Sequence, residues 1–176
     1  MENSAALPVQ APTPASALRV VLDSNVWIDI LVFDDPATRP IRAALEAGTL
    51  EALIDPRCLT ELTRVLDYPQ FVRLNVDKEA ALAIVARLST LIAPRTQEGE
   101  RPLPKCRDRD DQKFLELAQA SRADWLVSKD RAVLKLAKRV ARDFAFRIGE
   151  PKPFVTAFEA RFEAPQATSA HIASAV

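Results

Sequence analysis

Carboxylates are the side chains of this sequence that are best suited to chemistry. Three aspartates crowd into four positions of the segment CRDRDDQKFLELA, and further acids end two short apolar runs. The sequence has one histidine, His171, and two distant cysteines, Cys58 and Cys106. These counts argue against histidine-based triads, zinc sites built from closely spaced Cys/His pairs and a disulfide scaffold. Any catalysis is therefore expected to depend on carboxylates.

Two acids directly follow predicted strands. The run VVLD ends at Asp23, and WLVSKD places Asp130 two residues after Ser128. Sites in open α/β sheets form outside the carboxyl ends of the strands, so both carboxylates would point into one crevice if the strands are close. Glu61 lies on the helix after the second predicted strand, at the border of its apolar stripe. The three acids could therefore converge.

Converging carboxylates would favour a divalent cation. Mg²⁺ and Mn²⁺ prefer hard oxygen ligands, and carboxylates from several elements can supply them. Acids packed together without a cation would repel and raise each other's pKa values. An ion held there could activate water and stabilise the charge of a phosphodiester during its cleavage.

Each acid also has an ordinary structural explanation. Asp23 and Asp130 could each cap the helix that follows, and Glu61 alone could be a surface glutamate. The cluster at 108–111 could be a solvated capping segment, in which Asp108 caps the backbone N–H of Asp111. Helical periodicity does not choose within the cluster, because its last two aspartates flank the apolar face on opposite sides. The remaining aspartates are expected at surface, turn or capping positions (Asp29, Asp34, Asp35, Asp55, Asp67, Asp77).

Short apolar runs alternate with helical patterns along the chain, which predicts a three-layer α/β/α fold with a central parallel sheet of four to five strands. The strands are expected at residues 18–23, 50–54, 91–93, 125–128 and 144–149. The helices are expected at residues 24–32, 35–48, 56–69, 77–92, 110–121, 131–140 and 150–162.

The length of 176 residues suits one domain with a substantial core. We expect it at residues 18–160, after a flexible leader at 1–17 and before a flexible tail at 161–176. The leader has no signal-peptide pattern, and no apolar run approaches a membrane span, so a cytoplasmic protein is expected. Lys+Arg and Asp+Glu are both 24, so bulk charge neither indicates nor excludes a nucleic-acid partner.

Four segments between Leu18 and Phe158 together resemble the PIN-domain family of metal-dependent nucleases. They are VVLDSNVWIDIL, LTELTRVLDYPQF, RDRDDQKFLELAQASRADWLVSKDRAVLKL and FRIGEPKPFVTAF. Their spacing is most similar to the branch assigned to the toxins of toxin–antitoxin systems. Mild departures are Ser24, where Thr is commoner in the family, and Asp55, where Ser is frequent.

The resemblance implies a PIN-like fold and an acidic quartet that binds Mg²⁺ or Mn²⁺, formed by Asp23, Glu61, Asp111 and Asp130. It selects Asp111 because the family's acid lies three residues before a helix hydrophobic and seven before a small residue. It further implies that Asn25 and Ser128 support the quartet through hydrogen bonds. Asp108 is a cap or an outer contributor.

The function implied is that of a Mg²⁺- or Mn²⁺-dependent endoribonuclease, the toxin of a toxin–antitoxin pair. Its partners would be an RNA substrate, a cognate antitoxin and a second copy in a homodimer. Nearby bases could contact phosphates or simply be solvated (Arg57, Arg64, Lys129, Arg131). One alternative is a catalytically weak interaction module of the same fold. Another is a phosphatase with an aspartate nucleophile, which the asparagine at position 25 disfavours, since that class needs a second Asp there.

Overall fold

The computed structural model describes residues 17–93 and 99–163, and within them five parallel strands form one sheet. The order across the sheet is β3-β2-β1-β4-β5. The strands are β1 (Leu18–Leu22), β2 (Leu50–Ile54), β3 (Ser89–Leu91), β4 (Trp125–Val127) and β5 (Arg147–Gly149). This arrangement confirms the predicted α/β/α fold with a parallel sheet.

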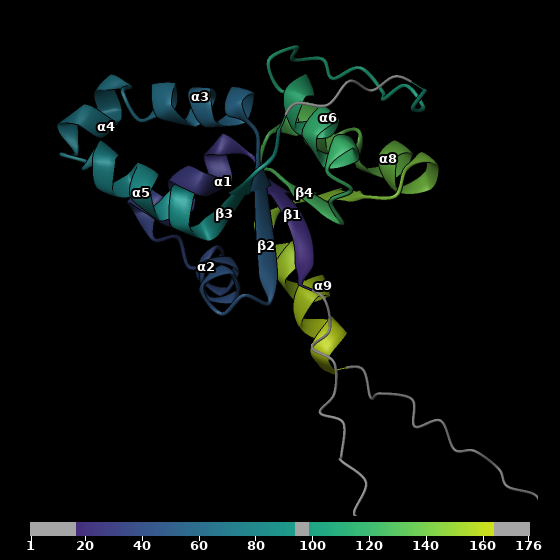
Figure 1. Ribbon diagram of the computed structural model, residues 1–176, viewed down its shortest axis with the longest axis horizontal. Helices are drawn as coiled ribbons and strands as arrows, with labels where there is room; N and C mark the ends of the chain where they lie inside the picture. Colours follow the sequence, from purple (N-terminus) through teal and green to yellow (C-terminus); the bar gives the residue numbers. More distant parts are fainter. Residues whose placement is uncertain (1–16, 94–98, 164–176) are drawn as a thin grey trace, which may run out of the picture.

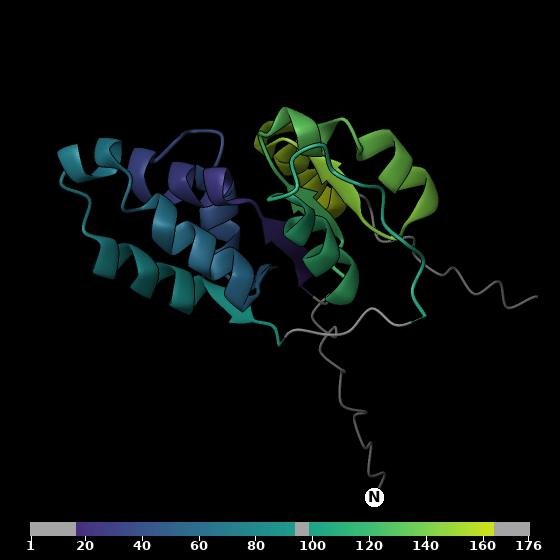
Figure 2. The ribbon, with the colours of Figure 1, turned by 90° about the horizontal axis from the view of Figure 1, so that it is seen from above.

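Helices fill the connections between these strands, because parallel strands must be joined by crossover connections. Those described are α1 (Ser24–Ile28), the π-helix η1 (Asp29–Phe33), α2 (Arg39–Glu46), α3 (Pro56–Val65), α4 (Pro69–Arg73), α5 (Lys78–Leu88), α6 (Gln112–Ala120), α7 (Arg131–Leu134), α8 (Ala137–Asp143) and α9 (Pro151–Glu163). Helices α1 to α5 gather on the side of β2 and β3, whereas α6 and α8 lie on the side of β4 and β5 (Figures 1 and 2).

Several boundaries differ from the sequence prediction. The predicted helix 24–32 changes to π-helical geometry at Asp29, and the predicted helix 131–140 breaks into α7 and α8 although no Gly or Pro marks the break. The predicted helix 56–69 ends at Val65, and Pro69 begins the separate helix α4. Strand β3 lies two residues before the predicted 91–93, because α5 already ends at Leu88.

The ends of the described chain bear on the predicted domain limits. Helix α9 continues to Glu163, three residues beyond the predicted domain end at 160. Almost all of the predicted leader and most of the predicted tail lie outside the described residues. Within the described ranges, no helix is long and apolar enough to cross a membrane.

The sheet is buried by helices on both faces, as its strand sequences require. The middle of β1 and of β4 is inaccessible to solvent, including Val20, Val21 and Leu126. Such continuous branched runs are typical of parallel strands that are covered twice. Helix α3 joins this core through Leu62, which is also fully buried. The core therefore fixes the carboxyl ends of the strands and the helices beside them.

Truncation of the core side chain on α3 is predicted to destabilise the protein. Leu62→Ala should lower the free energy of unfolding by about 2–5 kcal/mol, because a fully buried leucine leaves a cavity. Urea denaturation measures this change. Leu74→Ala is the matched control, since the exposed Leu74 side chain should contribute less than about 0.5 kcal/mol. Equal effects of the two variants would contradict this description of the core.

Candidate active site

The carboxyl ends of β1 and β4 bring Asp23 and Ser128 together. Leu22 pairs with Val127, and the Asp23 N–H donates to the Val127 carbonyl at 3.0 Å. The Ser128 hydroxyl donates to Asp23 Oδ2 at 2.5 Å, and the Asn25 amide donates to the same oxygen at 3.1 Å. Both supporting contacts expected from the family resemblance are therefore present.

Asp23 begins α1 without using its carboxylate as a cap. Its side chain makes no capping hydrogen bond, and its backbone carbonyl accepts from the N–H groups of Val26 and Trp27. The carboxylate is nevertheless almost completely buried. Burial without a capping role leaves this carboxylate directed at other polar groups of the site.

Asp130 caps the helix that follows it, one of the two roles that the sequence left open, and also lies next to Ser128. Its Oδ1 accepts from the N–H groups of Ala132 and Val133, at 2.6 and 3.3 Å, and so caps α7. Its own N–H donates to the Ser128 hydroxyl at 3.0 Å. Ser128 thereby connects Asp23 and Asp130, one from each of two adjacent strands.

Glu61 projects from α3 and is held at both of its oxygens. The Ser24 hydroxyl donates to Oε1 at 2.9 Å, and the ammonium of Lys113 forms an ion pair with Oε2. The Lys113 and Glu61 side chains are only 15% and 14% exposed. Lys113 was missed by the sequence reasoning. Its place in the first turn of α6, where the helix dipole disfavours a cation, was the available signal.

The aspartates of the 108–111 cluster point to different places. Asp111 faces the same cavity as the rest of the quartet, whereas Asp110 faces a separate cavity. The prediction that Asp108 caps the N–H of Asp111 is wrong: its Oδ1 accepts from Asp110 N at 2.9 Å. The reason is local, because an aspartate readily bonds the N–H two residues ahead in an Asx turn.

The quartet lines one open cavity of about 360 Å³, which we call the acidic cavity. Its walls come from α1, η1, α3, α4 and the segments before α6 and α7. The lining residues are Asp23, Ser24, Asn25, Ile28, Asp29, Phe33, Glu61, Val65, Tyr68, Gln70, Phe71, Asp111, Lys129 and Asp130. The structure thus brings all four predicted acids to one place, and excludes Asp108 from it.

Burial and repulsion raise the pKa of two quartet members. The pKa of Asp111 rises to about 7, first because of partial burial and then because of the negative charges of Asp23, Asp130, Asp108 and Glu61. Burial also raises the pKa of Asp23, with further contributions from Glu61 and Asp130, against the lowering effect of the Ser128 hydrogen bond. An added positive charge would relieve this repulsion.

The chemistry of the donors fits a hard divalent cation. The quartet offers only oxygen ligands, which Mg²⁺ and Mn²⁺ prefer. In the described parts of the chain, no group of three or more Asp, Glu, His or Cys side chains is arranged to hold a metal ion. The fit therefore rests on ligand type and on the raised pKa values, and the residues that would hold an ion are Asp23, Asp111 and Asp130.

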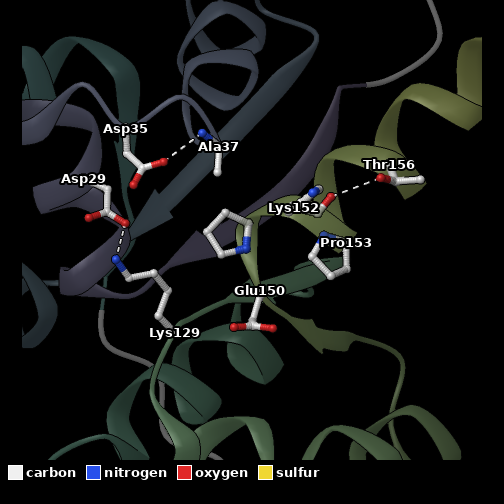
Figure 3. A pocket seen from close by; sticks show the side chains of 9 residues that line it. Asp29, Asp35, Ala37, Lys129, Glu150, Lys152, Pro153 and Thr156 are labelled. Carbon is white, nitrogen blue, oxygen red and sulfur yellow. Dashed lines mark hydrogen bonds and ion pairs between the residues drawn. The ribbon is translucent and has the colours of Figure 1, made fainter.

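Asp29 is a site residue that the sequence did not reveal. It was expected at a surface, turn or capping position, but it is buried and its Oδ2 lies 2.5 Å from the Lys129 ammonium. Both residues line the acidic cavity and also a neighbouring cavity of about 550 Å³. Figure 3 shows the Lys129 side chain pointing to Asp29 beside Glu150 and Pro153. This ion pair therefore borders both cavities.

Of the basic residues proposed from the sequence to contact phosphates, Lys129 alone is among the residues that line the acidic cavity. Arg57 lies over the separate cavity near Asp110, where it pairs with Asp55 at 3.0 Å and Glu116 at 2.5 Å. Arg64 and Arg131 are exposed outside the lining. Asp55 is a buried cap, since it accepts from Cys58 N at 2.8 Å.

Comparison with known proteins identifies the family of the chain. A family model described as the PIN domain matches residues 19–132, which is more than half of the chain and includes the whole quartet. The chain therefore belongs to the PIN-domain family. PIN domains are generally nucleases and typically bind divalent metals. No curated protein matches the chain.

The raised pKa of Asp111 predicts a pH-dependent gain in stability for Asp111→Asn in metal-free protein. A carboxyl whose pKa rises from 3.8 to about 7 on folding binds more protons in the folded state, so stability falls as pH rises between these values. The substitution should therefore raise Tm by roughly 2–4 °C or more at pH 8, if it gains about 1 kcal/mol, and change it little at pH 4. Thermal unfolding in EDTA measures both.

Asp110→Asn is the control for this measurement, because Asp110 is exposed and faces the other cavity. The difference in Tm between Asp110→Asn and the wild type should be the same at pH 8 and pH 4. A gain for Asp111→Asn that is equal at both pH values would mean that burial and the neighbouring charges do not raise the pKa of Asp111.

Proposed function

We propose that this PIN domain is a Mg²⁺- or Mn²⁺-dependent endoribonuclease and the toxin of a toxin–antitoxin pair. The observation that supports the proposal best is the acidic cavity, where four carboxylates from separate elements meet and the pKa of Asp111 rises to about 7. Ordinary capping or surface roles would not require these acids to converge. A metal-dependent nuclease does require it.

Separate residues supply the parts of the proposed mechanism. Asp23, Asp111 and Asp130 would hold the metal, and a divalent ion there would activate water and neutralise phosphodiester charge. Ser128 and Asn25 orient the Asp23 carboxylate through their hydrogen bonds to Oδ2. Glu61 is held by Ser24 and Lys113 at the cavity wall, where it can orient the substrate or an outer water.

Lys129 is the basic residue that we assign to the substrate phosphate. It lines the acidic cavity and forms an ion pair with Asp29, and its backbone N–H donates to Asn25 at 3.2 Å. A phosphate next to the metal would compete with Asp29 for the ammonium. The proposal also includes RNA as the substrate in place of DNA, and a cytoplasmic location. It further includes a cognate antitoxin and a second copy of the chain in a homodimer as partners.

A second candidate is an interaction module with weak catalysis. It is favoured by the arrangement of the described carboxylates, which form no group ready to hold an ion, and by the ion pair that already neutralises Glu61. In that case a partner protein, and not a substrate, would occupy the acidic cavity. Metal binding and cleavage separate the two candidates.

Cleavage assays test the assignment within the quartet. Single-stranded RNA incubated with the protein and Mn²⁺ should be cut, and Asp23→Asn or Asp111→Asn should reduce the rate by about 100-fold or more, since even outer partners of a metal site contribute 10- to 100-fold. Asp110→Asn should leave the rate within about twofold, because Asp110 faces another cavity. Equal losses for both neighbouring aspartates would contradict the assignment.

Calorimetric titration with Mn²⁺ tests the metal directly. Asp130→Asn should weaken binding by at least about tenfold, because a carboxylate ligand is lost while its amide oxygen can still cap α7. Asp77→Asn is the control, since Asp77 caps α5 in the same way but lies outside the acidic cavity. Equal metal affinities of the wild type and Asp130→Asn would argue against a metal at this site.

A further inference from the structure

We propose that Phe33 and Tyr68 form a stacking subsite for an unpaired nucleobase at the rim of the acidic cavity. The inference rests on the proposed nuclease function and adds the part of the cavity that would bind a base of the single strand. The side chains are 55% and 40% exposed, and both line the cavity that holds the quartet. Two solvent-exposed aromatic rings beside converging carboxylates are not explained by packing of the core.

The Phe33 ring and the Tyr68 backbone are held in place by neighbouring residues. The ring of Phe33 lies 6.1 Å from that of Phe71, at an angle of 56°, and Phe71 is buried. Tyr68 precedes Pro69 at the start of α4, where its carbonyl accepts from the N–H groups of Phe71 and Val72. A ring on a fixed backbone loses little entropy when a base stacks on it.

Charge in the cavity explains why a base contact is needed. The quartet and Asp29 repel phosphates, and Lys129, the basic residue of the lining proposed for phosphate, is already paired with Asp29. Counterion release within this cavity can therefore supply little of the affinity for RNA, whereas stacking on an aromatic ring does not depend on charge.

The geometry favours a single strand over a duplex or a protein partner. A paired base has both faces covered by its neighbours, so only an unpaired base can stack on a protein ring. The exposed aliphatic residues Val72 and Leu74 lie on and after α4 but do not line the acidic cavity. The aromatic residues lie beside the acids, which fits a strand whose phosphate must reach the quartet.

Binding of a short fluorescein-labelled RNA, measured by anisotropy in EDTA and low salt, tests the subsite without cleavage. Phe33→Leu and Tyr68→Leu should each weaken binding by about 5- to 100-fold, and Tyr68→Phe, which keeps the ring, should not. An oligonucleotide of the same length with abasic sites should bind the wild type as weakly as the leucine variants bind RNA. A duplex of the same sequence should also bind weakly.

Phe162→Leu is the matched control, since Phe162 is 59% exposed on α9 and lies outside the acidic cavity. Its affinity should equal that of the wild type. Equal binding of abasic and normal RNA, or an equal loss for Phe162→Leu, would overturn the subsite. A third result would also overturn the subsite. If Phe33→Leu binds RNA as the wild type does, and if the protein self-associates in a way that Leu74→Ser abolishes, the surface is a protein interface.

The outcomes also separate this inference from the nuclease proposal. Base-dependent binding that needs both rings, without any cleavage in Mn²⁺, would support the subsite and refute the nuclease. The opposite result is metal-dependent cleavage that Asp23→Asn abolishes, together with RNA binding that Phe33→Leu and Tyr68→Leu do not affect. It would support the nuclease and refute the subsite.

Discussion

The parallel pairing of β1 with β4 is the constraint on which the site depends. It sets the Asp23 N–H against the Val127 carbonyl and so places the next side chain, Ser128, 2.5 Å from the Asp23 carboxylate. A register shift of one residue would turn every side chain of β1 to the opposite face and remove Asp23 from the crevice. Helix α3, which packs against α1 and α6, then adds Glu61, and the N-cap position of α6, which packs on β1 and β4, adds Asp111.

Carboxylates that lie close together repel each other, and the surrounding residues offset this repulsion more for some of them than for others. Asp23 is stabilised by two hydrogen bonds, Glu61 by Ser24 and the Lys113 ammonium, and Asp29 by Lys129. Asp111 makes no side-chain cap to α6 and faces its acidic neighbours, and its pKa rises to about 7. The uncompensated charge therefore lies at Asp111, next to Asp23 and Asp130, which is where a divalent cation would be most strongly attracted.

The sequence predicted what depends on local pattern and missed what depends on contacts between distant segments. Buried strands that end at an acid identified Asp23 and Asp130, because branched runs and parallel topology determine where such residues lie. Periodicity could not decide between Asp110 and Asp111, since both flank the apolar face of α6, and the family resemblance was needed. Lys113 and Asp29 were missed because their partners lie 52 and 100 residues away in the sequence.

Helix α4 shows how a small error in a boundary can hide part of a site. A continuous apolar pattern suggested one helix over residues 56–69, but the residue before a proline is driven into extended backbone, and Tyr68 adopts φ −64° and ψ 144°. The chain therefore turns there, and Pro69 starts a new helix whose residues Gln70 and Phe71 reach the acidic cavity. The proline thus completes the cavity by bringing aromatic side chains to acids that β1, β4 and α3 had already placed.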